Sequence, residues 1–137
     1  MKLFLDANLL VCVLNKEYPQ FPFCARVLSL AGQGGFILCT TPICLAIAFY
    51  FSEKKSGQVA AKQKLAVLLT KIQVCTADLK IVSQAVASKQ VTDLEDGIEY
   101  FAAKAAGCSA IISEDVGDFY FSDIPVHTAE EFLTSLG

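Results

Sequence analysis

Residues 93–119 read DLEDGIEYFAAKAAGCSAIISEDVGDF, and this stretch decides the fold because it predicts a helix that leads directly into a strand. Apolar side chains recur in it at helical spacing, which predicts one apolar helix face formed by Leu94, Ile98, Phe101 and Ala105. Gly107 follows the last of them and is typical of a helix end. Residues 110–113 then predict a short buried strand.

Acidic residues occur at two places in this unit. Asp93 and Asp96 lie at the predicted start of the helix, and Glu114, Asp115 and Asp118 follow the strand. A helix and the strand after it run antiparallel, so the first turn of the helix approaches the carboxyl end of the strand. The sequence therefore predicts that carboxylates remote along the chain meet at one edge of a sheet.

A third acidic position lies near the beginning of the chain. Residues 2–5 predict an apolar strand that ends abruptly in Asp6, and a helical apolar run over residues 9–14 follows. A charge directly after a buried strand is costly without a partner, so Asp6 has the strongest functional case. Sites in open α/β sheets form outside the carboxyl ends of strands. Asp6 and Asp115 would share that edge if their strands are neighbours, and spacing alone leaves the strand order open.

The composition favours one α/β domain that covers residues 1–137. Hydrophobic residues make up 54% of the chain and charged residues 18%, which excludes a disordered protein and favours a sheet covered on both faces. Further strands are predicted at 36–39, 72–75 and 124–126, and further helices at 23–31, 43–54, 58–71, 78–87 and 129–136. Because strands alternate with helices, the sheet is expected to be parallel with right-handed crossovers.

Cap signals mark several of the predicted helix starts. Thr92 and Glu95 match a capping box for the helix of the deciding stretch. Either Thr76 or Asp78 can cap the helix that ends near Ala87.

The charge balance gives no general attraction for nucleic acid. The formal net charge is −3, so a nucleic-acid substrate would need local lysines or bridging metal ions. The lysines at 54, 55, 62 and 64 are interpreted as a solvated face, with RNA contact as the alternative.

The six cysteines form no C-x-x-C pair, and most lie in apolar runs. We interpret them as buried reduced thiols, with a zinc site or disulfides as alternatives, and this favours a cytoplasmic protein. Residues 27–52 carry no charge, but glycines and a proline interrupt them. The apolar piece that remains, 36–51, is shorter than the roughly 20 residues that a membrane span needs. A buried strand followed by a buried helix is expected there, with no membrane association.

Four motifs in this order resemble the PIN-domain family, the metal-dependent nucleases that include toxin ribonucleases of the VapC type. They are LDANLL at residues 5–10, DLEDGI at 93–98, IISEDVGDF at 111–119 and IPVHTAEEF at 124–132. The resemblance covers nearly the whole chain. It implies a three-layer α/β/α fold with a five-stranded parallel sheet of order 3-2-1-4-5, in which the first and fourth strands are neighbours.

The resemblance also implies a set of site residues. Asp6, Asp96 and Asp115 match acidic catalytic positions that hold Mg²⁺ or Mn²⁺, and Asp118 is a further metal position. Asn8 and Ser113 match positions that hold the site in shape, and Asp93 is a near neighbour. At both positions metal binding is the favoured interpretation; the alternative is an acid at a helix start for Asp96 and a turn residue for Asp115.

The chain departs from the family pattern at two positions. The family usually has Glu in the helix after the second strand, whereas TPICLA at residues 41–46 is followed here by Ile47, which cannot bind a metal ion. Glu114 stands where the family often has Arg or another polar residue. We expect the first change to remove a ligand and the second to repel phosphate.

Three functions follow from these observations. The first is a metal-dependent endoribonuclease, implied by the resemblance to be a toxin with an antitoxin partner and a homodimeric assembly. The second, motivated by Ile47, is a PIN-like module that has lost catalysis and acts by binding or regulation. The third is another α/β protein with an acidic pocket, such as a phospho-acceptor receiver or an Asp-nucleophile phosphatase. Asn8 breaks the Asp-x-Asp pattern that such phosphatases require.

Overall fold

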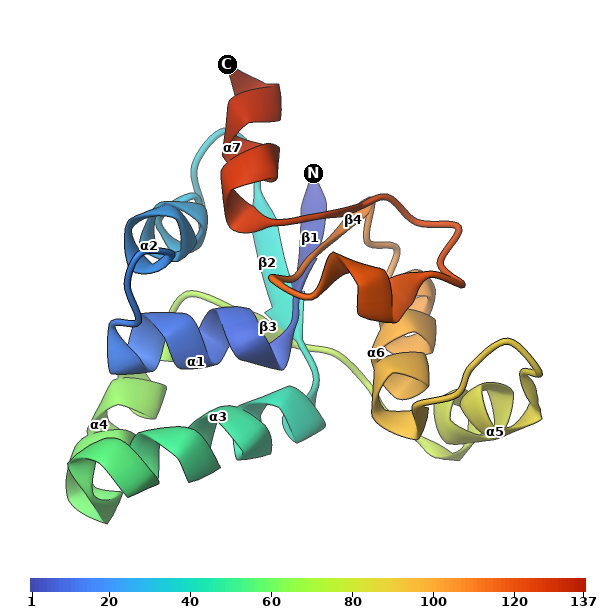
Figure 1. The fold of residues 1–137 in the computed structure, drawn as a ribbon, viewed down its shortest axis with the longest axis horizontal. Coiled ribbons are helices and arrows are strands. Elements are labelled where there is room, and N and C mark those ends of the chain that lie inside the picture. Colours follow the sequence, from blue (N-terminus) through green and yellow to red (C-terminus); the bar gives the residue numbers. More distant parts are fainter.

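The computed structural model describes residues 1–137 and contains a five-stranded sheet between layers of helices (Figure 1). The strands are β1 (Lys2–Leu5), β2 (Ile37–Thr40), β3 (Gln73–Val74), β4 (Ala110–Ile112) and β5 (Val126–His127). The helices are α1 (Ala7–Asn15), α2 (Phe21–Ser29), α3 (Pro42–Ser56), α4 (Gln58–Leu68), α5 (Leu79–Ala87), α6 (Leu94–Ala105), η1 (Val116–Phe119, a 3-10 helix) and α7 (Ala129–Leu136).

The sheet has the order β3-β2-β1-β4-β5 with every pair parallel, which confirms the predicted order 3-2-1-4-5. Strand β1 is central, with Leu3 opposite Leu38 of β2 and Leu5 opposite Ile112 of β4. In Figure 1, α5 and α6 lie on one side of the sheet, and the other long helices form a group on the opposite side. The predicted three-layer α/β/α architecture is therefore confirmed.

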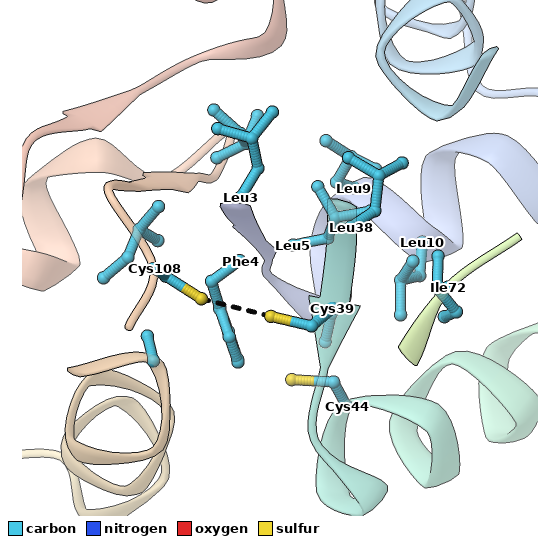
Figure 2. Packing of buried hydrophobic residues seen from close by; sticks show 14 of the residues in the cluster. Leu3, Phe4, Leu5, Leu9, Leu10, Leu38, Cys39, Cys44, Ile72 and Cys108 are labelled. Atoms are coloured by element: carbon cyan, nitrogen blue, oxygen red, sulfur yellow. Dashed lines mark hydrogen bonds between the residues drawn. The ribbon is translucent and has the colours of Figure 1, made fainter. Parts of the chain in front are cut away.

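The core is built around β1, whose Leu3, Phe4 and Leu5 are all fully buried. A strand covered by helices on both faces needs apolar side chains at successive positions, which explains its unbroken apolar run. Figure 2 shows Phe4 beside the contact between Cys39 and Cys108, whose Sγ atoms are 3.1 Å apart. Leu9 and Leu10 of α1 pack on the other side of the strand (Figure 2).

All six cysteines are buried and free, as predicted. The charge-free stretch of residues 27–52 forms the end of α2, strand β2 and most of α3, in agreement with the expected buried strand and helix. None of the helices combines the length and apolar character that crossing a bilayer would require.

The predicted capping box at Thr92 is wrong, because α6 begins one residue later. Asp93 is the N-cap, and its Oδ1 accepts a hydrogen bond from the backbone N–H of Glu95 at 3.0 Å. Its carboxylate thereby satisfies one of the free amides of the first turn. Of the two candidate caps of α5, Thr76 and Asp78, the structure has Asp78 as the N-cap. Its Oδ1 accepts a hydrogen bond from the backbone N–H of Ile81 at 3.2 Å.

The predicted apolar face of α6 is only partly correct. Ile98 is buried, but Leu94 and Ala105 are exposed. The side of the helix turned to the interior instead carries Glu99, Ala102 and Ala103, each at most 1% exposed. Small alanines let α6 approach its neighbours closely, so the buried side does not coincide with the largest apolar side chains.

Two of the lysines interpreted as a solvated face make contacts that hold α1. Lys55 donates a hydrogen bond to the carbonyl oxygen of Asn15, and Lys64 donates to that of Leu14 at 3.2 Å. Carbonyls at the end of a helix lack partners within it, and cations there are favourable. These two lysines therefore anchor the end of α1 to α3 and α4.

We predict that Gly97→Ala in α6 destabilises the protein by about 1–3 kcal/mol, although alanine favours a helix by about 1 kcal/mol over glycine. A Cβ at this position would lie 2.5 Å from Cγ1 of Val91 and 3.2 Å from Cβ of Ala85. Urea unfolding measures the free-energy change. Val91→Ala is the matched background: adding Gly97→Ala to it should cost less, and an equal cost in both backgrounds would contradict the steric cause.

Candidate metal centre

Asp6 is held at the carboxyl end of β1 by local hydrogen bonds. Its backbone N–H continues the ladder to Ile112 of β4 at 3.0 Å. Its side chain is the N-cap of α1, with Oδ1 accepting from the N–H of Ala7 at 2.7 Å, and Oδ2 accepts from the Ser113 hydroxyl at 2.7 Å. The residue is 5% exposed, so a carboxylate is fixed at the edge of the core by neutral donors.

Ser113 and Asn8 connect Asp6 to the loop after β4. The amide Nδ2 of Asn8 donates to Ser113 Oγ at 3.2 Å and to Asp115 Oδ2 at 3.0 Å. Its Oδ1 accepts from the backbone N–H of Glu114 at 3.2 Å, and Ser113 Oγ accepts from the N–H of Asp115 at 3.0 Å. Together these bonds fix the backbone that carries Asp115 relative to Asp6.

Asp96, in the first turn of α6, lines the same pocket as Asp6 and Asp115. Burial, followed by the charges of Asp93, Asp118, Asp6 and Glu95, raises the pKa of Asp96 from 3.8 to about 7. The pKa of Asp118, in η1, is raised by burial and by the neighbouring Asp115. Both shifts have the sign expected when carboxylates converge without a neutralising cation.

These side chains line one pocket of about 320 Å³. Six of its lining residues are acidic and none is basic; the acids are Asp6, Glu17, Glu95, Asp96, Asp115 and Asp118. The ion pair found in the protein, between Lys104 and Asp123, involves none of them. Clustered carboxylate oxygens are the ligands that hard divalent cations such as Mg²⁺ or Mn²⁺ take, so the donor set fits such an ion.

Asp93 and Glu114 do not line this pocket. Asp93 is exposed and caps α6, and it affects the pocket only through its charge, which contributes to the raised pKa of Asp96. Glu114 turns the other way: its Oε1 accepts from the backbone N–H of Ala129 at 3.3 Å and contacts Cys24 Sγ at 3.6 Å. Glu114 is therefore bound at the N-terminus of α7 and does not line the pocket, and its expected repulsion of phosphate stays a prediction.

Ile47 lines the pocket from α3, together with Val11 and Phe51. The side chain at position 47 is thus part of an apolar wall. The pocket therefore combines carboxylates from α6 and from the segments that follow β1 and β4 with apolar side chains of α1 and α3.

Sequence reasoning missed Glu99, which is fully buried one helical turn after Asp96. Carboxylate oxygens of Glu95, Asp96 and Glu99 lie within 4.8 Å of one another. The available signal was the i, i+3 spacing of Asp96 and Glu99, which places them on one side of a helix. The prediction of an apolar face on α6 placed Glu99 outside the buried side of the helix, so this spacing was not used.

Comparison with known proteins gives a family model that matches most of the chain and a relative that is similar over nearly its whole length. The sequence model of the family described as "PIN domain" matches residues 2–117. "Ribonuclease VapC1" of Aquifex aeolicus (strain VF5) is 28% identical over 134 residues, which cover 96% of this chain and 92% of that protein.

Solved structures of similar fold include the sarcin-ricin loop cleaving toxin VapC20 of Mycobacterium tuberculosis. Its TM-score is 0.71 at 16% identity, over 89% of this chain and 95% of that one. VapBC-1 of nontypeable Haemophilus influenzae gives a TM-score of 0.71 at 17% identity, over 95% and 99% of the two chains. At these identities the likeness concerns the fold.

We predict that the metal-free protein loses stability as the pH rises from about 4 to about 7. The folded state keeps a proton on Asp96 up to a pKa of about 7, whereas the ordinary value is 3.8, so the unfolded chain binds fewer protons in this window. Thermal unfolding in EDTA across this range measures the slope. Asp96→Asn should flatten it and raise the Tm at pH 8, and Glu53→Gln, an exposed acid outside the pocket, should leave it unchanged. Some slope should remain in Asp96→Asn, because burial also raises the pKa values of Glu95, Glu99 and Asp118. A slope as steep as that of the wild type would contradict the assignment.

Proposed function

The chain belongs to the PIN domain family, and on this premise we propose that it is a metal-dependent endoribonuclease that hydrolyses RNA phosphodiester bonds. The observation that carries the proposal is the convergence of carboxylates from β1, α6 and the loop after β4 in one pocket without a basic residue. The name of the Aquifex relative, a ribonuclease similar over nearly the whole chain, supports the same activity.

We assign Asp6, Asp96 and Asp115 as the catalytic and metal-binding residues, with Asp118 as a further ligand. When bound, Mg²⁺ or Mn²⁺ polarises the scissile phosphodiester and offsets its charge. Asp6 is fixed by Ser113 and by the N–H of Ala7, so it is already oriented for an ion. Asn8 holds Asp115, and Ser113 and Asn8 are therefore positioning residues.

The apolar wall serves the RNA. Phe51 is 45% exposed at the rim of the pocket, beside Val11 and Ile47. An exposed aromatic ring next to a phosphate-binding site can stack on an unpaired base, a contact worth about 1–3 kcal/mol per base. The proposal therefore favours a single-stranded RNA segment as substrate.

Ile47 supports a second candidate function, a PIN-domain protein with weakened or lost catalysis that binds or regulates. With hydrocarbon on the α3 side, fewer oxygens surround an ion than in a pocket closed by an acid there. The two functions differ in whether RNA is cut, which the cleavage test below decides.

We also propose that the protein is a toxin with a protein antitoxin as partner. Two neighbours in structure are VapBC complexes, one from Rickettsia felis and one from Haemophilus influenzae. A hollow between α1, α2 and α4 offers a surface for such a partner. Its apolar residues are Val13, Leu14, Leu28, Val67 and Leu68, and its rim carries Lys16, Lys64 and Lys71. This combination suits an amphipathic segment with acidic flanks.

A homodimer and a cytoplasmic location complete the proposal. The six buried free thiols are consistent with a reducing compartment. Light scattering of the purified protein determines whether it is dimeric.

RNA cleavage with Mg²⁺ or Mn²⁺ tests the nuclease. We expect Asp6→Asn to lower the rate by more than about 100-fold, and Ser113→Ala by about 10–100-fold, the range typical of groups that support a metal ligand. Glu53→Gln is the matched control and should cleave as the wild type does. Equal rates in wild type and Asp6→Asn would disprove the assignment. If no metal promotes cleavage by the wild type, the binding function stands, and Ile47→Glu tests whether an added acid restores activity.

Co-purification with the product of the neighbouring gene tests the partner surface. We expect Val67→Asp to weaken the complex at least about 10-fold, or about 1.4 kcal/mol, because it places a charge in the apolar hollow. Val59→Asp is the control, since Val59 lies on the same helix, is 72% exposed and is outside the hollow. Equal binding by both variants would place the partner elsewhere.

A further inference from the structure

Glu99 has a carboxyl group whose position the nuclease proposal does not use. It lies on α6, is fully buried, and does not line the acidic pocket. Its Oε1 accepts a contact from the Cys44 thiol at 3.0 Å, and its Oε2 has no hydrogen-bond partner. A buried carboxyl oxygen without a partner is costly, so the site has unused capacity to bind a positive group.

Cys44 faces this carboxyl from the first turn of α3. Its thiol points from α3 toward α6 (Figure 2). Thr41, the N-cap of α3, donates from Oγ1 to the sulfur at 3.2 Å and accepts from the Cys44 N–H at 3.2 Å. The thiol is therefore held in one orientation by the start of the helix.

Asp6 completes the group from the end of β1. One donor atom each from Asp6, Cys44 and Glu99 lies within 4.8 Å of the others, and all three residues are buried. Asp6 also lines the open pocket, whereas Cys44 and Glu99 do not. The group thus lies behind the acidic pocket and shares one carboxylate with it.

No lysine, arginine or histidine neutralises these groups in the hydrogen-bond or ion-pair network. Burial is the largest cause of the raised pKa of Glu99, followed by its contact with Asp6, and burial also raises the pKa of the Cys44 thiol. A divalent cation at this place would satisfy the unpartnered Glu99 oxygen.

We propose that Asp6, Cys44 and Glu99 form an inner site for a borderline divalent cation of the Zn²⁺ or Co²⁺ class. Two carboxylates and one thiolate are a donor set that such ions prefer, whereas Mg²⁺ takes oxygen ligands and avoids sulfur. The inference does not rest on nuclease activity. Because Asp6 belongs to both places, an ion in the inner site also acts on the acidic pocket.

Cobalt titration of the metal-free full chain tests the site. Co²⁺ bound to a thiolate gives a near-ultraviolet charge-transfer band, which we expect in the wild type and not in Cys44→Ser. Glu99→Gln should weaken Co²⁺ binding at least about 10-fold. Stoichiometric Zn²⁺ should abolish the band, and a large excess of Mg²⁺ should leave it. The matched control is Cys24→Ser, which alters another fully buried cysteine and should retain the band.

Several results would overturn the proposal: no band in the wild type, a band retained in Cys44→Ser, or displacement by Mg²⁺. X-ray absorption of the zinc-loaded wild type needs no variant and therefore decides the matter if a variant does not fold. We expect a single sulfur at about 2.3 Å among oxygen ligands. Two or more sulfurs would instead assign the ion to the buried pair Cys39 and Cys108, whose Sγ atoms are 3.1 Å apart. RNA cleavage measured on the same wild-type sample separates the two proposals, since cleavage without a cobalt band disproves only the inner site.

Discussion

The parallel pairing of β1 with β4 is the constraint on which the rest of the structure depends. Leu5 lies opposite Ile112, so Asp6 and Ser113, the next residues of the two strands, emerge side by side at the carboxyl edge. Residues 3–5 of β1 and 110–112 of β4 are buried, and neither strand could slip without placing a charged or polar side chain in the core. Burial of apolar surface thereby fixes the position of a carboxylate that is itself unfavourable near the core.

The acids around this edge are kept in place by neutral donors. Backbone amides, the Ser113 hydroxyl and the Asn8 amide contact Asp6 and Asp115, and no lysine or arginine does so. Neutral donors orient a carboxylate and leave its charge uncompensated, whereas an ion pair would cancel it. This choice of partners preserves a strong negative field in the pocket, which is what a site for a cation requires.

The fold and the acids at strand ends could be predicted because both follow from local patterns. Asp6 and Asp115 each follow an apolar strand, and such patterns are visible in one sequence; the strand order came from the resemblance to a family. Glu99 escaped because helix periodicity was judged from large apolar side chains, while α6 buries alanines and one acid. The direction of Glu114 also escaped, since its partner at the start of α7 lies 15 residues away and only the fold brings the two together.

The bond between Glu114 and α7 couples the end of the chain to the acidic edge. Glu114 precedes Asp115 directly, and its carboxylate accepts from the first N–H of α7 while Cys24 of α2 contacts the same oxygen. A carboxylate at a helix N-terminus is favourable, so this contact holds the start of α7 against the loop after β4. A molecule that displaced α7 would break this hydrogen bond and loosen the loop that carries Asp115. Binding at the surface of α7 could thereby alter the acidic pocket.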